Sequence, residues 1–131
     1  MPNVQIDIRQ QYPHVIEIGI IDAVHKALKE AFQLPETDRD VRLVVHEPHR
    51  FSVPSHLLQP ELFTVICIDC FTGRSLDTKR YLYRLIVEKL NHFLIPSDHI
   101  KIILRESALE NWGIRGGQAA CDVDLGFQVN L

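Results

Sequence analysis

The chain of 131 residues has few cysteines and an odd number of them, three in all, with one methionine and one tryptophan. So few cysteines exclude a disulfide-rich scaffold and are typical of free thiols in a reducing compartment. The only histidine cluster, His46-x-x-His49 with His56, falls on a strand end and in loops. It lacks the ligand number and geometry of a zinc site, so we expect no bound metal.

Long runs of basic residues or of apolar residues are also absent. No segment is rich in Lys and Arg, and the net charge of -3 argues against nucleic acid as a partner. The apolar stretches at residues 63–67 and 100–104 are far too short to cross a bilayer. The first residues lack the basic start and apolar block of a signal peptide. We therefore expect a cytoplasmic protein with no membrane partner.

Motifs of other enzyme classes are absent or weak. Cys67 and Cys70 have the C-x-x-C spacing of redox pairs, which usually lie at a helix N-terminus where the thiolate is stabilised. Here they lie in the β-branched run FTVICIDC (63–70), where positions three apart face opposite ways. We therefore expect a structural role for both. Gly116-Gly117 lacks the helix and lysine of a phosphate-binding loop, and no Ser-His-Asp pattern occurs.

The chain contains an internal repeat. FQLP (32–35) recurs as FLIP (93–96), and each copy is followed by an aspartate, Asp38 or Asp98, and then by a β-branched run that ends in glutamate. We predict a single domain over residues 1–131. It consists of a first βαβ unit at 2–47, a second at 62–106 and a C-terminal tail at 107–131, and a proline-containing loop joins the units.

Each unit has the pattern of strand, helix, strand. In the first, residues 4–8 alternate as a half-buried strand. Residues 15–32 then form a helix, which Leu34-Pro35 ends because the residue before a proline avoids the α conformation. The expected buried face of this helix consists of Ile21, Val24, Leu28 and Ala31.

In the second unit, Ser75 is the expected N-cap of the helix, and the negative charge of Asp77 in the first turn complements the helix dipole. Ile95-Pro96 is expected to end it. A strand, crossover helix and strand normally form a right-handed parallel pair. The tail carries a glycine-rich turn at 113–117 and a further short strand near 127–131. The buried stripe of the second helix is expected to be Leu82, Leu85, Ile86, Leu90 and Phe93.

Two fused βαβ units, a proline directly after Met1 and a W-G-x-R-G tail resemble the tautomerase superfamily. The similarity is to the fused-repeat members of about this length, which include the malonate semialdehyde decarboxylase group, and it runs through nearly the whole chain. Its most specific segment is ENWGIRG (110–116), followed by AFQLPETDR (31–39) and GRS (73–75).

The resemblance implies that Met1 is removed and that the freed nitrogen of Pro2 is the catalytic acid or base. A secondary amine at a chain start can gain and lose a proton, and an α-amino group titrates near about 8 in model peptides. Burial beside apolar groups and cations lowers the pKa of such an amine, which makes it a usable base at neutral pH.

Two further residues are implied to be catalytic. Arg74 matches the arginine at the start of the second helix that binds the substrate carboxylate, and its donors form a planar fork that suits a carboxylate. Asp38 matches the aspartate of the decarboxylase subgroup, proposed there to position or activate a water. Asp98 holds the same place in the other repeat, so a local role in the loop is an equal alternative for Asp38.

Three residues are expected to contact the substrate. Trp112 is implied to form an apolar wall, although a lone tryptophan is often part of a core. Arg115 adds positive charge. Thr72 stands where the decarboxylase pattern has a second arginine, and this departure favours proton transfer over decarboxylation.

Together these features predict an α+β fold with a four-stranded mixed sheet, both helices on one face, and a strand or hairpin in the tail. The resemblance implies a homotrimer. The expected function is a cofactor-free tautomerase acting on a small 2-oxo or enol carboxylic acid. One alternative is a decarboxylase or hydratase of a 3-oxo acid. Another is a non-catalytic ligand-binding module with a ferredoxin-like fold, which has the same element order.

Overall fold

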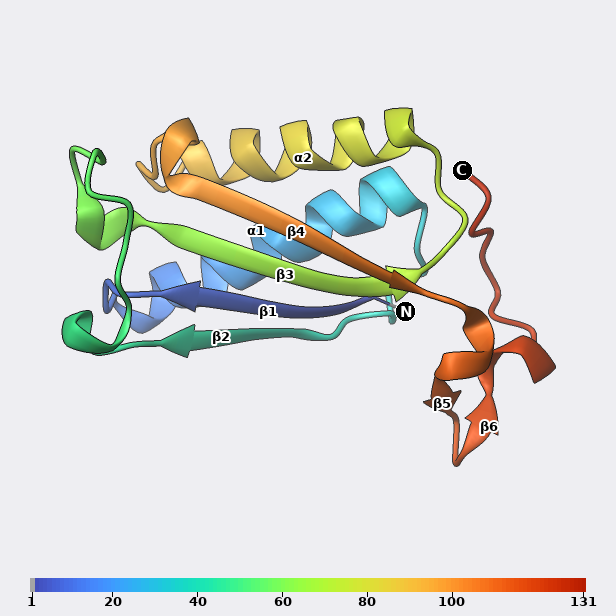
Figure 1. Cartoon of the computed structure of the whole chain (residues 1–131). Helices are drawn as coiled ribbons and strands as arrows, with labels where there is room; N and C mark the ends of the chain where they lie inside the picture. The colour runs from blue at the N-terminus through green and yellow to red at the C-terminus, as the bar shows by residue number, and fades with distance from the viewer. Residues whose placement is uncertain (1) are drawn as a thin grey trace.

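The computed structural model describes residues 2–131 (Figure 1), so the expected removal of Met1 concerns a residue outside the described range. Two strand–helix–strand segments follow one another and are succeeded by a small hairpin. The larger elements are β1 (Asn3–Ile8), α1 (His14–Phe32), β2 (Val41–Val45), β3 (Thr64–Phe71), α2 (Leu76–Asn91) and β4 (Ile100–Ser107). The hairpin consists of β5 (Gly113–Ile114) and β6 (Gln118–Ala119).

The sheet has the strand order β2-β1-β3-β4. Each strand–helix–strand segment forms a parallel pair, β1 with β2 and β3 with β4, and the two segments join through the antiparallel pair β1–β3. Both helices pack side by side on one face of this sheet, as Figure 1 shows. The expected four-stranded mixed sheet, the placement of both helices and the tail hairpin are confirmed.

The core lies between the sheet and the helices. Alternate residues of β1 and β3 point toward the helices and are fully buried, as at Ile6 and Ile66. The buried stripe of α2 is confirmed at its four helical positions, whereas Phe93 lies beyond the helix and is only half-buried. In α1, Ile21 is half-buried and the neighbouring Ile20 takes the core position, so the predicted face was wrong by one residue there.

The helix ends follow local chemistry. Ser75 caps α2 as expected, since its Oγ accepts a hydrogen bond from the backbone N–H of Thr78 at 3.2 Å. The predicted end of α2 at Ile95-Pro96 was wrong, because the helix ends at Asn91. The Asn91 side-chain amide donates to the Ile95 carbonyl at 2.8 Å, and Leu94 adopts a left-handed φ of 64°, which turns the chain before the proline.

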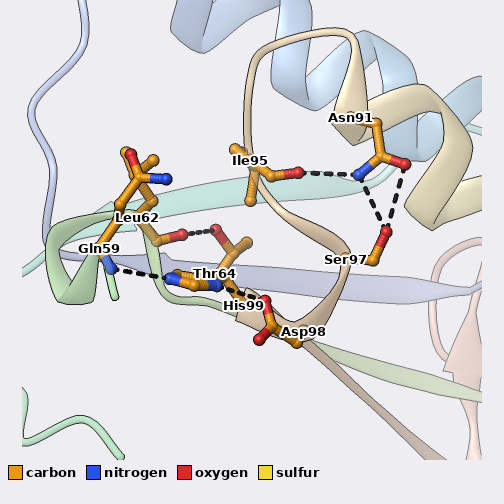
Figure 2. Close-up of polar contacts among 8 residues, drawn as sticks. All are labelled: Gln59, Leu62, Thr64, Asn91, Ile95, Ser97, Asp98 and His99. Carbon is orange, nitrogen blue, oxygen red and sulfur yellow. Dashed lines mark hydrogen bonds and ion pairs between the residues drawn. The ribbon is translucent and has the colours of Figure 1, made fainter. Parts of the chain in front are cut away.

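At the end of the sheet where β3 begins, the buried His99 holds the linker, residues 46–63 between β2 and β3, against the start of β4 (Figure 2). His99 Nε2 accepts from the backbone N–H of Gln59 at 3.2 Å, so Nδ1 carries the proton and donates to Asp98 Oδ1 at 2.7 Å. Thr64 Oγ1 donates to the Leu62 carbonyl at 3.0 Å in the same region. These bonds fix the path of the chain into β3.

The tail departs from the prediction after the hairpin. The strand expected near residues 127–131 does not form, because side chains rather than a neighbouring strand bind the backbone carbonyls of this region. The carbonyl of Leu131 accepts from Ser75, and the carbonyl of Asp124 accepts from Arg115. No helix within residues 2–131 has the length and apolar character required to cross a membrane.

Candidate functional site

The candidate site lies at the end of the sheet where β1 begins and β3 ends. Asn3 pairs with Asp69 in the antiparallel register, so one further residue in each direction sets Pro2 opposite Cys70. Both of these residues are buried. The backbone N–H of Val4 donates to the carbonyl of Asp40 at 3.0 Å, which brings the loop after α1 to the same end.

Arg74 lies in the turn between β3 and α2 and is only 5% exposed. Its Nη1 donates to the carbonyl of Phe71 at 3.2 Å, and its Cζ lies 4.1 Å from the centre of the Phe32 ring. Within residues 2–131, its Nε and Nη2 are buried and have no hydrogen-bond partner. Two nitrogens of the guanidinium fork therefore remain available as donors to an anion.

The surroundings of Arg74 are mostly apolar. Burial lowers the pKa of the Arg74 guanidinium below its ordinary value, and the negative charges of Cys70, when it is ionised, and of Glu106 oppose this effect. Asp38 acts in the same direction with a smaller effect. Burial also raises the pKa of the Cys70 thiol, so this neighbour is a neutral thiol at physiological pH. Arg74 remains a cation because an arginine is protonated at any physiological pH.

Asp38 and Arg115 line one pocket of about 420 Å³ beside this end of the sheet. Asp38 is half-buried in the turn after α1, where its backbone N–H donates to the Pro35 carbonyl at 3.0 Å. Arg115 is exposed, and its Nη1 donates to the Asp124 carbonyl at 2.6 Å. The pocket lining also includes Pro35, Arg39, Leu125 and Phe127.

An aromatic cluster stands between this pocket and the end of β3. Trp112 is half-buried and packs edge-on against Phe71, with 4.8 Å between ring centres, and Phe127 stacks on Phe71 at 6.5 Å. The Trp112 Nε1–H donates to Ser107 Oγ at 2.8 Å, which fixes the indole ring. The cluster can exclude water from one side of Arg74, since Phe71 also supplies the carbonyl that Arg74 binds.

The predicted residues therefore fall into related groups. Pro2 and Arg74 lie at the same end of the sheet, where Pro2 stands opposite Cys70 and Arg74 follows β3, and Asp38 and Arg115 lie in the adjoining pocket. Thr72 is exposed, and its backbone N–H donates to the Ser107 carbonyl at 3.0 Å, so it continues the β3–β4 pairing.

Sequence reasoning missed two contributors. Cys70 was expected to be structural, and Phe32 was regarded as part of a repeated helix end. The Phe32 ring nevertheless contacts the guanidinium of Arg74, and Cys70 lies close enough to influence the pKa of that guanidinium. The alternation of β3 indicates that Cys70 points toward the helices, but its neighbours depend on the register with β1. All three cysteines are free. Residues 2–131 contain no group of three or more His, Cys, Asp or Glu side chains placed to hold a metal ion.

A family model described as a tautomerase enzyme matches residues 38–115. A solved malonate semialdehyde decarboxylase, described as inhibited by 3-bromopropiolate, is 28% identical, with a TM-score of 0.75 over 89% of this chain and 92% of that one. Another malonate semialdehyde decarboxylase is 21% identical, with a TM-score of 0.81 over 93% and 99%. A fused 4-OT described as an asymmetric trimer is 19% identical, with a TM-score of 0.81 over 92% and 97%.

Proposed function

Because the chain belongs to the tautomerase enzyme family, we propose that it is a cofactor-free tautomerase of a small 2-oxo or enol carboxylic acid. The observation that carries this proposal is the state of Arg74, a buried cation with two guanidinium nitrogens that lack a partner among residues 2–131. A buried unpaired donor destabilises a fold, so such a group is typical of a site that receives an anion. The substrate carboxylate is the anion that this site suits.

In the proposed mechanism, removal of Met1 frees the nitrogen of Pro2 as a secondary amine. Arg74 binds the carboxylate through two parallel N–H donors and so places the enol beside Pro2. The amine accepts the proton of the enol hydroxyl and then delivers it to the neighbouring carbon, which yields the ketone and restores the neutral amine. Arg74 stabilises the negative charge that develops on the enolate between the two steps.

The environment supports such a base. An amine that is buried among apolar side chains and near a cation has a lowered pKa, since both factors disfavour its protonated form. Pro2 is buried, and Cys70, which faces it by register, is a neutral thiol. Trp112 and Phe127, which both pack on Phe71, exclude water from the side of the site that they cover.

The proposal is tested with protein whose Met1 is shown by intact mass to be absent. We expect ketonisation of phenylenolpyruvate, and we expect Pro2→Ala to reduce kcat by about 10²–10⁴-fold, the usual contribution of a general acid or base. Retention of full activity by Pro2→Ala would contradict the role of the ring nitrogen. A parent protein that is inert to all enol acids would favour a non-catalytic binding module.

A second candidate is decarboxylation or hydration of a 3-oxo acid, with Asp38 acting on a water. Two observations favour it. Asp38 lines a pocket together with Arg115, and the 28% identical structure is a malonate semialdehyde decarboxylase. The uncharged Thr72, where that pattern has a second arginine, favours the tautomerase. Release of carbon dioxide from malonate semialdehyde without ketonisation of phenylenolpyruvate would reverse our preference.

We also propose that the protein is a homotrimer, since the fused 4-OT structure is described as an asymmetric trimer. The face of the sheet away from the helices supports an assembly, since it carries the half-buried Val65 and Cys67 and the exposed Ile103. Sedimentation analysis tests this proposal, and a monomer at micromolar concentration would contradict it.

A further inference from the structure

The tail segment 124–131, called the strap below, runs past the end of β3 toward the start of α2 (Figure 1). Side chains hold it at both ends. Arg115 Nη1 donates to the Asp124 carbonyl at 2.6 Å, and Ser75 Oγ and Thr78 Oγ1 donate to the Leu131 carbonyl at 2.9 and 2.5 Å. The strap is therefore fixed by a few side-chain hydrogen bonds and forms no strand pairing.

Between its two ends the strap packs closely against the turn that carries Arg74. A Cβ atom added to Gly73 would lie 2.9 Å from the Val129 carbonyl oxygen, so only glycine permits this approach. Phe127 stacks on Phe71, the residue whose carbonyl binds Arg74. The strap thus contacts residues on both sides of Arg74 in the sequence.

This packing closes one side of the turn that carries Arg74. The guanidinium is almost completely buried, although two of its nitrogens have no partner among the described residues. The adjoining pocket is lined by residues that include Asp38, Arg115 and Phe127, and its lining does not include Arg74. A carboxylate that reaches Arg74 from this pocket therefore has to pass the strap residue Phe127, which stacks on Phe71.

We propose that residues 124–131 gate the carboxylate-binding arginine: the strap opens to admit substrate to Arg74 and closes over it to exclude water. The inference rests on the proposed function, in which Arg74 holds the substrate carboxylate. Gly126, whose φ of 81° suits glycine, is the hinge, and Arg115 is the latch because it binds the strap on the side of the substrate pocket.

The gate is tested by the accessibility of Arg74 to phenylglyoxal, a reagent that modifies guanidinium groups, with peptide mass mapping. Thr78→Val removes the shortest bond to the strap and retains the N-cap, since Ser75 Oγ still accepts from the residue 78 amide. The matched control is Thr64→Val, which removes the same kind of hydroxyl-to-carbonyl bond at the opposite end of the sheet (Figure 2). The exposed Arg84 is the internal reference for reagent activity.

We expect Thr78→Val to accelerate modification of Arg74 about fivefold over the parent, the factor that corresponds to loss of one ordinary hydrogen bond. Hydrogen exchange of the amides of residues 127–131 is expected to accelerate by a similar factor. Thr64→Val is expected to change neither rate. An unchanged Arg74 rate in Thr78→Val, or an equal increase in both variants, would overturn the gate.

The two proposals fail separately. If the parent does not ketonise phenylenolpyruvate, the proposed function fails, and the phenylglyoxal and exchange rates still report whether the strap covers Arg74. If the parent is active but Arg74 does not respond to Thr78→Val, the strap is a static part of the wall and only the gate is refuted.

Discussion

Replacement of Arg74 by methionine is expected to abolish activity while changing the stability of the fold very little. Truncation of a buried side chain usually destabilises a protein by about 2–5 kcal/mol. Arg74 is buried to the same extent as core residues, since it is 5% exposed. Its polar atoms, however, are poorly satisfied, and this difference determines the expected result.

The opposing contributions are similar in size. Arg74→Met loses the charged hydrogen bond to the Phe71 carbonyl, worth about 1.5–3 kcal/mol, and the cation–π contact with Phe32, worth about 1–2 kcal/mol. It also removes a desolvated cation with two nitrogens that have no partner among residues 2–131, each of which costs the fold about 1–3 kcal/mol. A methionine sulfur against the Phe32 ring restores about 1 kcal/mol. The net change in the free energy of unfolding is expected to be within about 2 kcal/mol of zero.

Urea unfolding of parent and variant measures the stability, and kcat/KM for phenylenolpyruvate measures the function. Arg84→Met is the matched control, because Arg84 also stacks on an aromatic ring, Tyr81 at 5.3 Å, but is exposed. The control is expected to change stability by less than about 0.5 kcal/mol and to leave activity intact. The reasoning is refuted if Arg74→Met loses more than about 3 kcal/mol, or if it retains the activity of the parent.

Three further outcomes are expected. Burial lowers the pKa of His25, so as the pH falls below about 6.5 the unfolded chain binds a proton before the folded chain does, and the free energy of unfolding decreases from pH 7 toward pH 5. Urea unfolding at several pH values should show a weaker pH dependence of stability for His25→Gln than for the parent, and equal pH dependence in both would contradict the assignment. A disulfide reagent with mass mapping should label the exposed Cys121 in the native protein and Cys70 only after unfolding, because burial raises the pKa of the Cys70 thiol; equal labelling rates would disprove its burial. His99→Ala should lower the free energy of unfolding in urea by about 3 kcal/mol and leave kcat/KM unchanged, because it leaves a cavity and an unpaired Gln59 N–H. A loss of stability below about 1 kcal/mol would show that the histidine does not anchor the linker.

Much of the fold follows from local pattern. The period-two strands and the apolar stripe of α2 were predicted because each is set by residues close in sequence. The N-cap at Ser75 was equally local. Ile21 was misplaced because Ile20 and Ile21 are both apolar, and the sequence does not reveal which one the sheet covers.

The remaining errors come from contacts between distant segments. The end of α2 depends on the Asn91 amide binding the Ile95 carbonyl, which the proline signal alone does not indicate. The absence of a final strand depends on Ser75, more than fifty residues upstream, binding the carbonyl of Leu131.

The candidate site was predictable only in part, for the same reason. The place of Arg74 before a helix follows from the residues around it. Its burial against Phe32 and its proximity to Cys70 depend on how α1 and β3 pack, and no pattern within one segment contains that information.

The strand arrangement that forms the candidate site occurs twice in the sheet. The first strand of each unit, β1 or β3, begins beside the start of its parallel partner, β2 or β4. At the second position the chain arrives through the linker, so the nitrogen of Phe63 is an ordinary amide, and His99 with Gln59 occupies the neighbouring interior. Titration with a substrate-like inhibitor that alkylates the catalytic amine should therefore reach saturation at a single equivalent for each polypeptide. Severing the backbone just ahead of Phe63 would create a second terminal amine at the equivalent end of β3, which makes the duplicated scaffold a starting point for engineering another reactive centre.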